Sequence, residues 1–231
     1  MNNSLLFLSI TTAFVGFSHT VLGPDHYLPF IAIAKSRNWS LKKTIFITFL
    51  CGIGHILSSV IISFIGIIFG FALNSLKIID SIRAEIAAWL LICFGLIYFL
   101  LGIKKCWRKK SKIVVDNYHS NLDVIKTKNN FEEKLDKKNV TAWILFIIFI
   151  FGPCESLIPL LLYPSIQNNL FAIIIITLIF SITTIGTMLI IVITIYSGLS
   201  LIKLESLEKY SFIAAGFLIL ICGLAIEFLG L

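Results

Sequence analysis

Six apolar stretches, each long enough to cross a lipid bilayer, dominate the sequence. A spanning helix needs about 20 mostly apolar residues, so each stretch predicts one membrane span. In hydrocarbon the backbone must satisfy its own hydrogen bonds, which favours helices for these spans. We therefore expect an all-α, multi-pass integral protein of the cell membrane with six transmembrane helices. The six stretches cover roughly residues 4–34, 44–73, 84–103, 140–163, 170–198 and 209–231.

The composition agrees with this interpretation. Of the 231 residues, 58% are hydrophobic and 13% are charged, whereas soluble domains carry about 25% charged residues. The net charge of +7 does not indicate a nucleic-acid partner, because the basic residues lie in short segments beside apolar stretches. No basic segment precedes the first apolar stretch, so we expect it to be a span rather than a cleaved signal peptide. The lipid bilayer is thus a predicted partner, and nucleic acid is not.

The basic residues also predict the orientation of the spans. All but two of the 19 Lys and Arg residues lie in the first, third and fifth connections, and the exceptions are Lys77 and Arg83. By the positive-inside rule these basic connections are cytoplasmic, which places both termini outside. The third connection, residues 104–139, is the one long polar segment and is predicted to be a mobile cytoplasmic loop. It separates residues 1–103 from residues 140–231.

A proline motif occurs once on each side of this loop. Gly23–Phe30 reads Gly-Pro-Asp-His-Tyr-Leu-Pro-Phe, and Gly152–Leu160 reads Gly-Pro-Cys-Glu-Ser-Leu-Ile-Pro-Leu. The third and sixth spans also end in similar Gly-Leu strings, which begin at Gly95 and Gly223. These similarities predict two three-helix repeats, 1–103 and 140–231. Because each repeat has an odd number of spans, the two must be inverted, as in many secondary transporters.

The Gly-Pro pairs predict a break in the first and fourth spans. Proline removes a backbone donor, and its ring clashes with the carbonyl group four residues earlier. A broken helix survives at membrane depth only where it is buried in protein or lines a cavity. Two breaks in corresponding spans therefore predict a central binding site.

Ionisable residues gather at these breaks. Their cost inside a membrane is about 2.5–3.5 kcal/mol each on insertion scales, so a group of them indicates function. Imidazole with carboxylate suits borderline divalent ions such as Ni, Co, Zn or Fe(II), and the two Met residues are too few for a Met-rich Cu(I) site. An interhelical hydrogen bond remains the alternative for His55. The candidate metal ligands are His19, Asp25 and His26 as the core, with His55, Cys154 and Glu155 as further ligands.

The segment His19–His26, which reads His-Thr-Val-Leu-Gly-Pro-Asp-His, resembles the first-half signature of the nickel/cobalt permease superfamily. The most similar branch has six spans and includes urease-accessory nickel permeases and sulfite-exporter-like proteins. The larger permeases have His-x4-Asp-His, whereas this chain has His-x5-Asp-His. The resemblance implies transport of a metal ion, nickel or cobalt, with His19, Asp25 and His26 as the binding group.

The main hypothesis is therefore a secondary transporter that moves a divalent transition-metal ion by alternating access. The ion is the substrate, and we expect no organic cofactor and no enzyme activity. No phosphate-binding loop for ATP is visible in the sequence. Metallochaperones or metalloenzyme maturation proteins are the expected protein partners.

Two alternatives remain open. The same fold resembles the thiol-disulfide carriers of cytochrome c biogenesis, which use one Pro-Cys pair in each half. This chain keeps Pro153-Cys154 but has Pro24-Asp25 in the first half, and Cys51 could serve only in a different geometry. The other alternative is export of a small, sulfite-like anion, which the helix N-termini at the breaks would bind.

Overall fold

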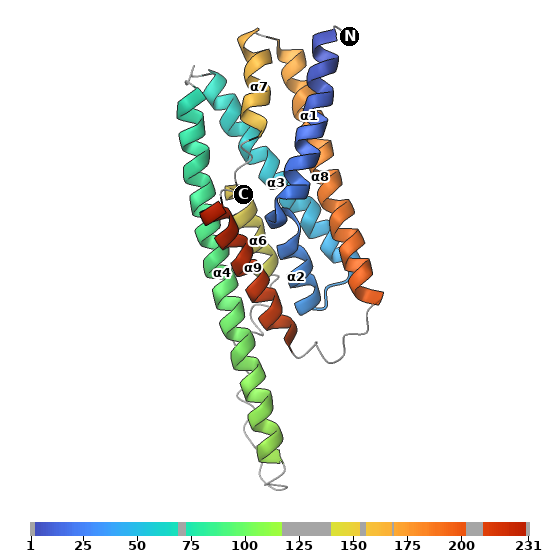
Figure 1. The fold of residues 1–231 in the computed structure, drawn as a ribbon, viewed down its shortest axis with the longest axis vertical. Coiled ribbons are helices and arrows are strands. Elements are labelled where there is room, and N and C mark those ends of the chain that lie inside the picture. Colours follow the sequence, from blue (N-terminus) through green and yellow to red (C-terminus); the bar gives the residue numbers. More distant parts are fainter. Residues whose placement is uncertain are drawn as a thin grey trace.

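The computed structural model describes residues 3–68, 73–116, 140–152, 156–167, 169–201 and 210–229 (Figure 1). These residues form helices and short connections and contain no strand, which confirms the all-α class. The helices are α1 (Asn3–Leu22), η1 (Pro24–His26), α2 (Leu28–Ser36), α3 (Leu41–Ile68), α4 (Leu73–Asp116), α6 (Val140–Phe151), α7 (Leu157–Ile166), α8 (Leu170–Leu201) and α9 (Ser211–Leu229).

Among the described residues, five helices are long and apolar enough to cross a membrane. They support a multi-pass membrane protein but not a count of exactly six spans. The fourth predicted span is the one that differs, because its residues are divided between the short helices α6 and α7. The five segments are Ser4–Leu22, Leu41–Gly66, Ile78–Trp107, Leu170–Ser200 and Ser211–Phe228.

The first predicted span is interrupted at its Gly-Pro pair. Helix α1 ends at Leu22, the 3₁₀ turn η1 follows at Pro24–His26, and α2 begins at Leu28. The Gly23 amide still bonds to the carbonyl oxygen of His19 at 3.0 Å, but Pro24 has no N–H to continue the ladder. Two residues after Pro24, the amide of His26 donates to the Gly23 carbonyl at 3.1 Å. The chain thus re-forms a helix four residues later on a shifted axis.

A second interruption follows α6, which ends at Phe151, while α7 begins at Leu157. In Figure 1 the path from α1 to α2 descends through the bundle, and the path from α6 to α7 ascends.

The short helix α2 lies in the largest buried apolar cluster. Phe30 and Ile33 are fully buried and pack with residues of α3, α6, α8 and α9, among them Phe149. A helix that is apolar on all sides is stable when other helices surround it completely. This burial holds η1, at the N-terminal end of α2, deep inside the protein.

Glycine residues allow α4 and α9 to touch backbone to backbone. A Cβ atom on Gly95 would lie 2.5 Å from the amide nitrogen of Leu220, and one on Gly102 would lie 2.7 Å from that of Ile213. From the other side, a Cβ atom on Gly223 would lie 2.8 Å from the nitrogen of Ile92. Small residues promote this close packing in membranes, where apolar burial alone does not hold helices together.

Helix α4 is longer than the span predicted from its apolar residues. It has 44 residues and continues to Asp116, so the boundary predicted at residue 103 falls inside a helix. The Lys-rich sequence that predicts a loop is compatible with a helix once it leaves the bilayer, because Lys and Arg are good helix formers. The rest of the predicted loop, residues 117–139, lies outside the described residues.

Candidate metal site

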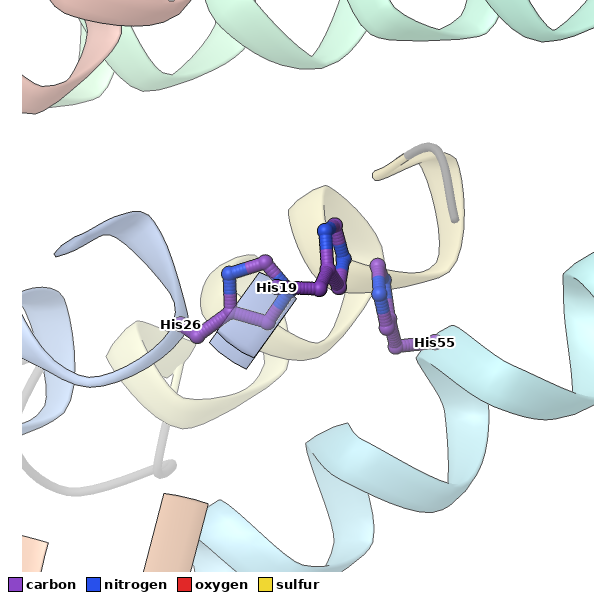
Figure 2. A group of neighbouring side chains, drawn as sticks. All are labelled: His19, His26 and His55. Atoms are coloured by element: carbon purple, nitrogen blue, oxygen red, sulfur yellow. The ribbon is translucent and has the colours of Figure 1, made fainter. Parts of the chain in front are cut away.

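Three histidine side chains meet at the first helix break (Figure 2). His19 comes from the last turn of α1, His26 from η1, and His55 from the middle of α3. The ring centroids are 4.7 Å apart for His19 and His26 and 5.2 Å apart for His26 and His55. One nitrogen from each ring can be chosen so that the three lie within 4.8 Å of one another.

The break explains how two histidines of one segment become neighbours. On a continuous helix, residues seven positions apart lie about 10 Å apart along the axis. The short 3₁₀ turn at Pro24–His26 replaces the regular helix instead, and the rings of His19 and His26 meet edge to face. The Gly-Pro pair therefore creates the cluster as well as interrupting the helix.

Two of the rings are held through Nδ1. His26 Nδ1 lies 3.1 Å from Oδ1 of Asp25, and His55 Nδ1 lies 3.3 Å from the carbonyl oxygen of Phe149. Each ring, with Nδ1 protonated, donates to an acceptor and keeps a lone pair on Nε2. Metal-binding histidines are typically held in this way, by a carboxylate or carbonyl on the other nitrogen.

The Nε2 atoms of the three rings have no hydrogen-bond partner among the described residues. Nε2 of His19, His26 and His55 is buried in each case and lacks a hydrogen bond. A buried polar atom without a partner costs about 1–3 kcal/mol. Three such atoms from one cluster are therefore expensive unless a ligand satisfies them.

The spacing is wider than that of a loaded tetrahedral site. Zinc–nitrogen bonds of about 2.0–2.1 Å place two nitrogen ligands about 3.4 Å apart, whereas the three nitrogens here are separated by up to 4.8 Å. The most widely separated nitrogens would need to approach each other by up to about 1.4 Å to bind an ion of this size.

Each of the two motif glycines lies against one of the rings. A Cβ atom on Gly23 would lie 2.6 Å from Nδ1 of His26, and one on Gly152 would lie 3.1 Å from Nδ1 of His55. Gly23 has φ −87°, a backbone conformation open to any residue. The requirement at this position is therefore space for the imidazole rather than conformational freedom.

The rings face a cavity of about 380 Å³. Its wall combines the histidines and Asp25 with apolar side chains, including Ala87 of α4 and Ile226 of α9. This volume has room for an ion together with several waters, each of which occupies about 30 Å³ in the liquid.

The structure places the other predicted ligands differently. Asp25 contacts His26 at Nδ1, so its position fits a residue that orients His26. Cys154 and Glu155 lie outside the described residues. Cys51 is fully buried in the core around α2. Cys222 of α9 is also buried in this core.

One buried charged pair beside the site is missing from the sequence interpretation. That interpretation places Arg83 in an outer connection, which is wrong, because Arg83 lies within α4 and is 8% exposed. It pairs with Asp80, one turn earlier, at 2.7 Å. The signal in the sequence was the i,i+3 spacing of opposite charges, which is typical of a helix.

The fold and this cluster define an α-helical, multi-pass membrane protein with an imidazole site at an intramembrane helix break. The family model described as "Cytochrome C biogenesis protein transmembrane region" matches residues 28–225. The chain therefore belongs to this family. Comparisons with curated proteins and with solved structures found no match.

The family match corrects the resemblance to nickel/cobalt permeases, which is wrong. That resemblance depended mainly on His19–His26, a segment that ends before the matched region begins at residue 28. A short motif of this kind produces a helix break that carries polar side chains, and such a break can occur in different families. The match also supports the thiol-disulfide alternative better than metal transport, to which it gives no support.

Proposed function

We propose that this chain binds a divalent transition-metal ion at His19, His26 and His55 and carries it across the membrane. The observation that carries the proposal is the group of three buried Nε2 atoms without partners. The geometry is the ground for this function, because the family match does not cover His19, Asp25 or His26.

The chemistry of the cluster favours borderline ions. Neutral imidazoles bind Zn, Cu, Fe and Ni, whereas Mg and Ca prefer oxygen ligands. Three protein ligands with a fourth position open to a cavity leave room for water or an incoming ligand. In the proposed cycle, a hydrated ion enters the cavity, exchanges waters for the three rings, and leaves when the rings separate.

The arrangement of the helices supports transport by alternating access. The two interrupted paths run in opposite directions, as two inverted repeats would, and such repeats rock against each other around a central site. Basic side chains lie over aromatic rings at one end of the bundle. Lys43 contacts the Trp39 ring at 4.9 Å, and Lys105 contacts the Phe212 ring at 3.9 Å. The proposed orientation has this end in the cytoplasm and both termini outside.

The test uses the purified full-length chain and titration with Co(II) alone, followed by cobalt uptake into proteoliposomes. Alanine at His19, His26 or His55 is expected to weaken cobalt binding at least about a hundredfold, since each ligand contributes several kcal/mol. The chain's one other histidine, His119, provides the matched control, and His119→Ala should bind as the wild type does. A wild-type protein that binds no cobalt, or an unaffected triple variant, would overturn the proposal.

Thiol-disulfide exchange is the second candidate, and the family match favours it. The second motif keeps Pro153-Cys154, and Cys222 of α9 is buried in the apolar core around α2. Under this function a cysteine thiolate attacks a partner's disulfide and forms a mixed disulfide, which a second thiol resolves. Trapping a mixed disulfide through Cys154 or Cys222 supports this candidate. Cys154→Ser and Cys222→Ser variants with full thiol-disulfide exchange activity exclude it.

A further inference from the structure

Arg83 and Asp80 form an ion pair inside a membrane-spanning segment. Both lie in the Ile78–Trp107 segment of α4, and Asp80 and Arg83 are 1% and 8% exposed. Charged residues at such positions are costly and typically functional. The metal site itself needs neither of them as a ligand.

The guanidinium group of Arg83 binds the broken end of α6. Its Nη2 donates to the carbonyl oxygens of Ile150 at 3.0 Å and Gly152 at 3.2 Å. The last carbonyls of a helix have no intrahelical donors, and in a membrane no bulk water replaces them. Arg83 supplies the missing donors at the place where the Gly-Pro pair stops α6.

The same guanidinium also contacts α3. Its Nη2 donates to the Ser58 hydroxyl at 2.8 Å, and its Nη1 donates to Asp80 at 2.7 Å and to Ser59 at 3.5 Å. Ser58 and Ser59 lie about one helical turn after His55. Arg83 thus ties α4, the histidine-bearing part of α3 and the end of α6 together.

The end of α6 in turn contacts His55. The Phe149 carbonyl, one residue before Ile150, accepts the hydrogen bond from His55 Nδ1. Gly152, whose carbonyl Arg83 binds, lies directly against the same ring. Any displacement of this helix end therefore moves both the acceptor and the surface that orient the imidazole.

We infer that Arg83 is a positioning residue for the metal site: it holds the broken end of α6, whose Phe149 carbonyl fixes the His55 ring beside that of His26. The inference rests on the proposed function. Asp80 holds the guanidinium from its own helix and cancels its charge, which would otherwise repel a cation nearby.

Lysine cannot replace Arg83 in this role. A guanidinium presents five N–H donors in a planar fork, whereas an ammonium group is a compact charge with three donors. The contacts of Arg83 run in several directions at once, to Asp80, Ser58 and the α6 carbonyls. A role in positioning and a role through charge therefore predict different outcomes for Arg83→Lys.

The experiment titrates Co(II) into the purified full-length protein and records both the affinity and the visible absorption, which reports the ligand geometry. Arg83→Gln and Arg83→Lys should each lower the affinity about tenfold or more, as losses of residues that orient ligands do, and change the spectrum. The neutral double variant Asp80→Asn/Arg83→Gln should not restore either property. Wild-type binding by Arg83→Lys, or recovery in the double variant, overturns the inference in favour of a charge effect.

Arg37→Gln is the matched control for the loss of a helix-tying arginine. Arg37 donates to the Tyr98 hydroxyl at 2.6 Å near the cytoplasmic end of the bundle, and its loss should leave the cobalt spectrum unchanged.

If the Arg83 variants do not fold, Ser58→Ala removes one partner of Arg83, and the affinity should fall about two- to fivefold. An unchanged affinity and spectrum in Ser58→Ala then overturns the inference. A wild-type protein that binds no cobalt refutes the proposed function itself, whereas equal binding by wild type and Arg83→Gln refutes the positioning role alone.

Discussion

His55 Nδ1 lies 3.3 Å from the carbonyl oxygen of Phe149, although 94 positions separate the two residues in the sequence. His55 belongs to α3, before the long polar segment, and Phe149 belongs to α6, after it. The site therefore depends on both parts of the chain. The part before the segment provides the three rings, and the part after it orients one of them.

Asp25→Asn tests the role of Asp25 as an orienting residue. The asparagine oxygen can still accept from His26 Nδ1 but without a negative charge, so the imidazole becomes a weaker ligand. We expect cobalt affinity to fall about 10- to 100-fold, as for other residues that orient metal ligands. Isothermal titration measures the change. Complete loss of binding, equal to that of His26→Ala, would instead indicate that Asp25 is itself a ligand.

Gly23→Ala and Gly152→Ala test the space beside the rings. The added methyl groups would lie 2.6 Å from His26 Nδ1 and 3.1 Å from His55 Nδ1, respectively. Such overpacking costs about 1–3 kcal/mol, which predicts about 5- to 150-fold weaker cobalt binding. The control is Gly186→Ala, because a Cβ atom there meets nothing within 4 Å. Cobalt binding by both motif variants equal to that of Gly186→Ala would contradict this account.

Gly95→Leu tests the contact between α4 and α9. Any side chain at this position meets the backbone of Leu220, so the helices must separate. We expect a destabilisation of about 1–3 kcal/mol or more, measured as a lower thermal midpoint in detergent. Gly198→Leu on α8 is the control, since its Cβ atom meets nothing within 4 Å. A thermal midpoint for Gly95→Leu that equals that of the control would show that the close packing does not stabilise the protein.

Single cysteines test the proposed orientation, in a background with all five native Cys residues replaced by Ser. Ser40, between α2 and α3, and Asn169, between α7 and α8, are both exposed. In intact cells a membrane-impermeant maleimide should label Asn169→Cys and leave Ser40→Cys unlabelled until the membrane is opened. The reverse labelling pattern would mean that the end of the bundle with Lys43 and Lys105 faces outside the cell.

Much of the first helix break was predictable, because its causes are local. Proline removes a donor wherever it occurs, so Gly23-Pro24 predicts the end of α1 at Leu22. The structure brings His19 and His26 of the predicted core together with His55, and metal binding by them stays a prediction. The contact of His55, on α3, with the other two rings follows from the tendency of polar side chains in a membrane to face the protein interior.

The contacts of Arg83 could not be predicted in the same way. They depend on how α4 packs against the ends of two other helices, and no local pattern encodes that packing. The span prediction also began at residue 84, because Asp80 and Arg83 lower the local hydropathy. The sequence prediction therefore missed the first turns of α4, because they contain this ion pair.

The single carboxylate beside the three rings gives the empty site a net negative charge. With the imidazoles neutral, as metal binding requires, the three rings add no charge, an ionised Asp25 adds one negative charge, and Asp80 and Arg83 cancel each other. Among these described groups, a bound divalent ion thus changes the local charge from −1 to +1. A potential of 100 mV acts on one charge with about 2.3 kcal/mol, so the voltage across the membrane pulls the loaded and the empty site in opposite directions. Under the proposed function, the membrane potential alone could drive the ion toward the negative side.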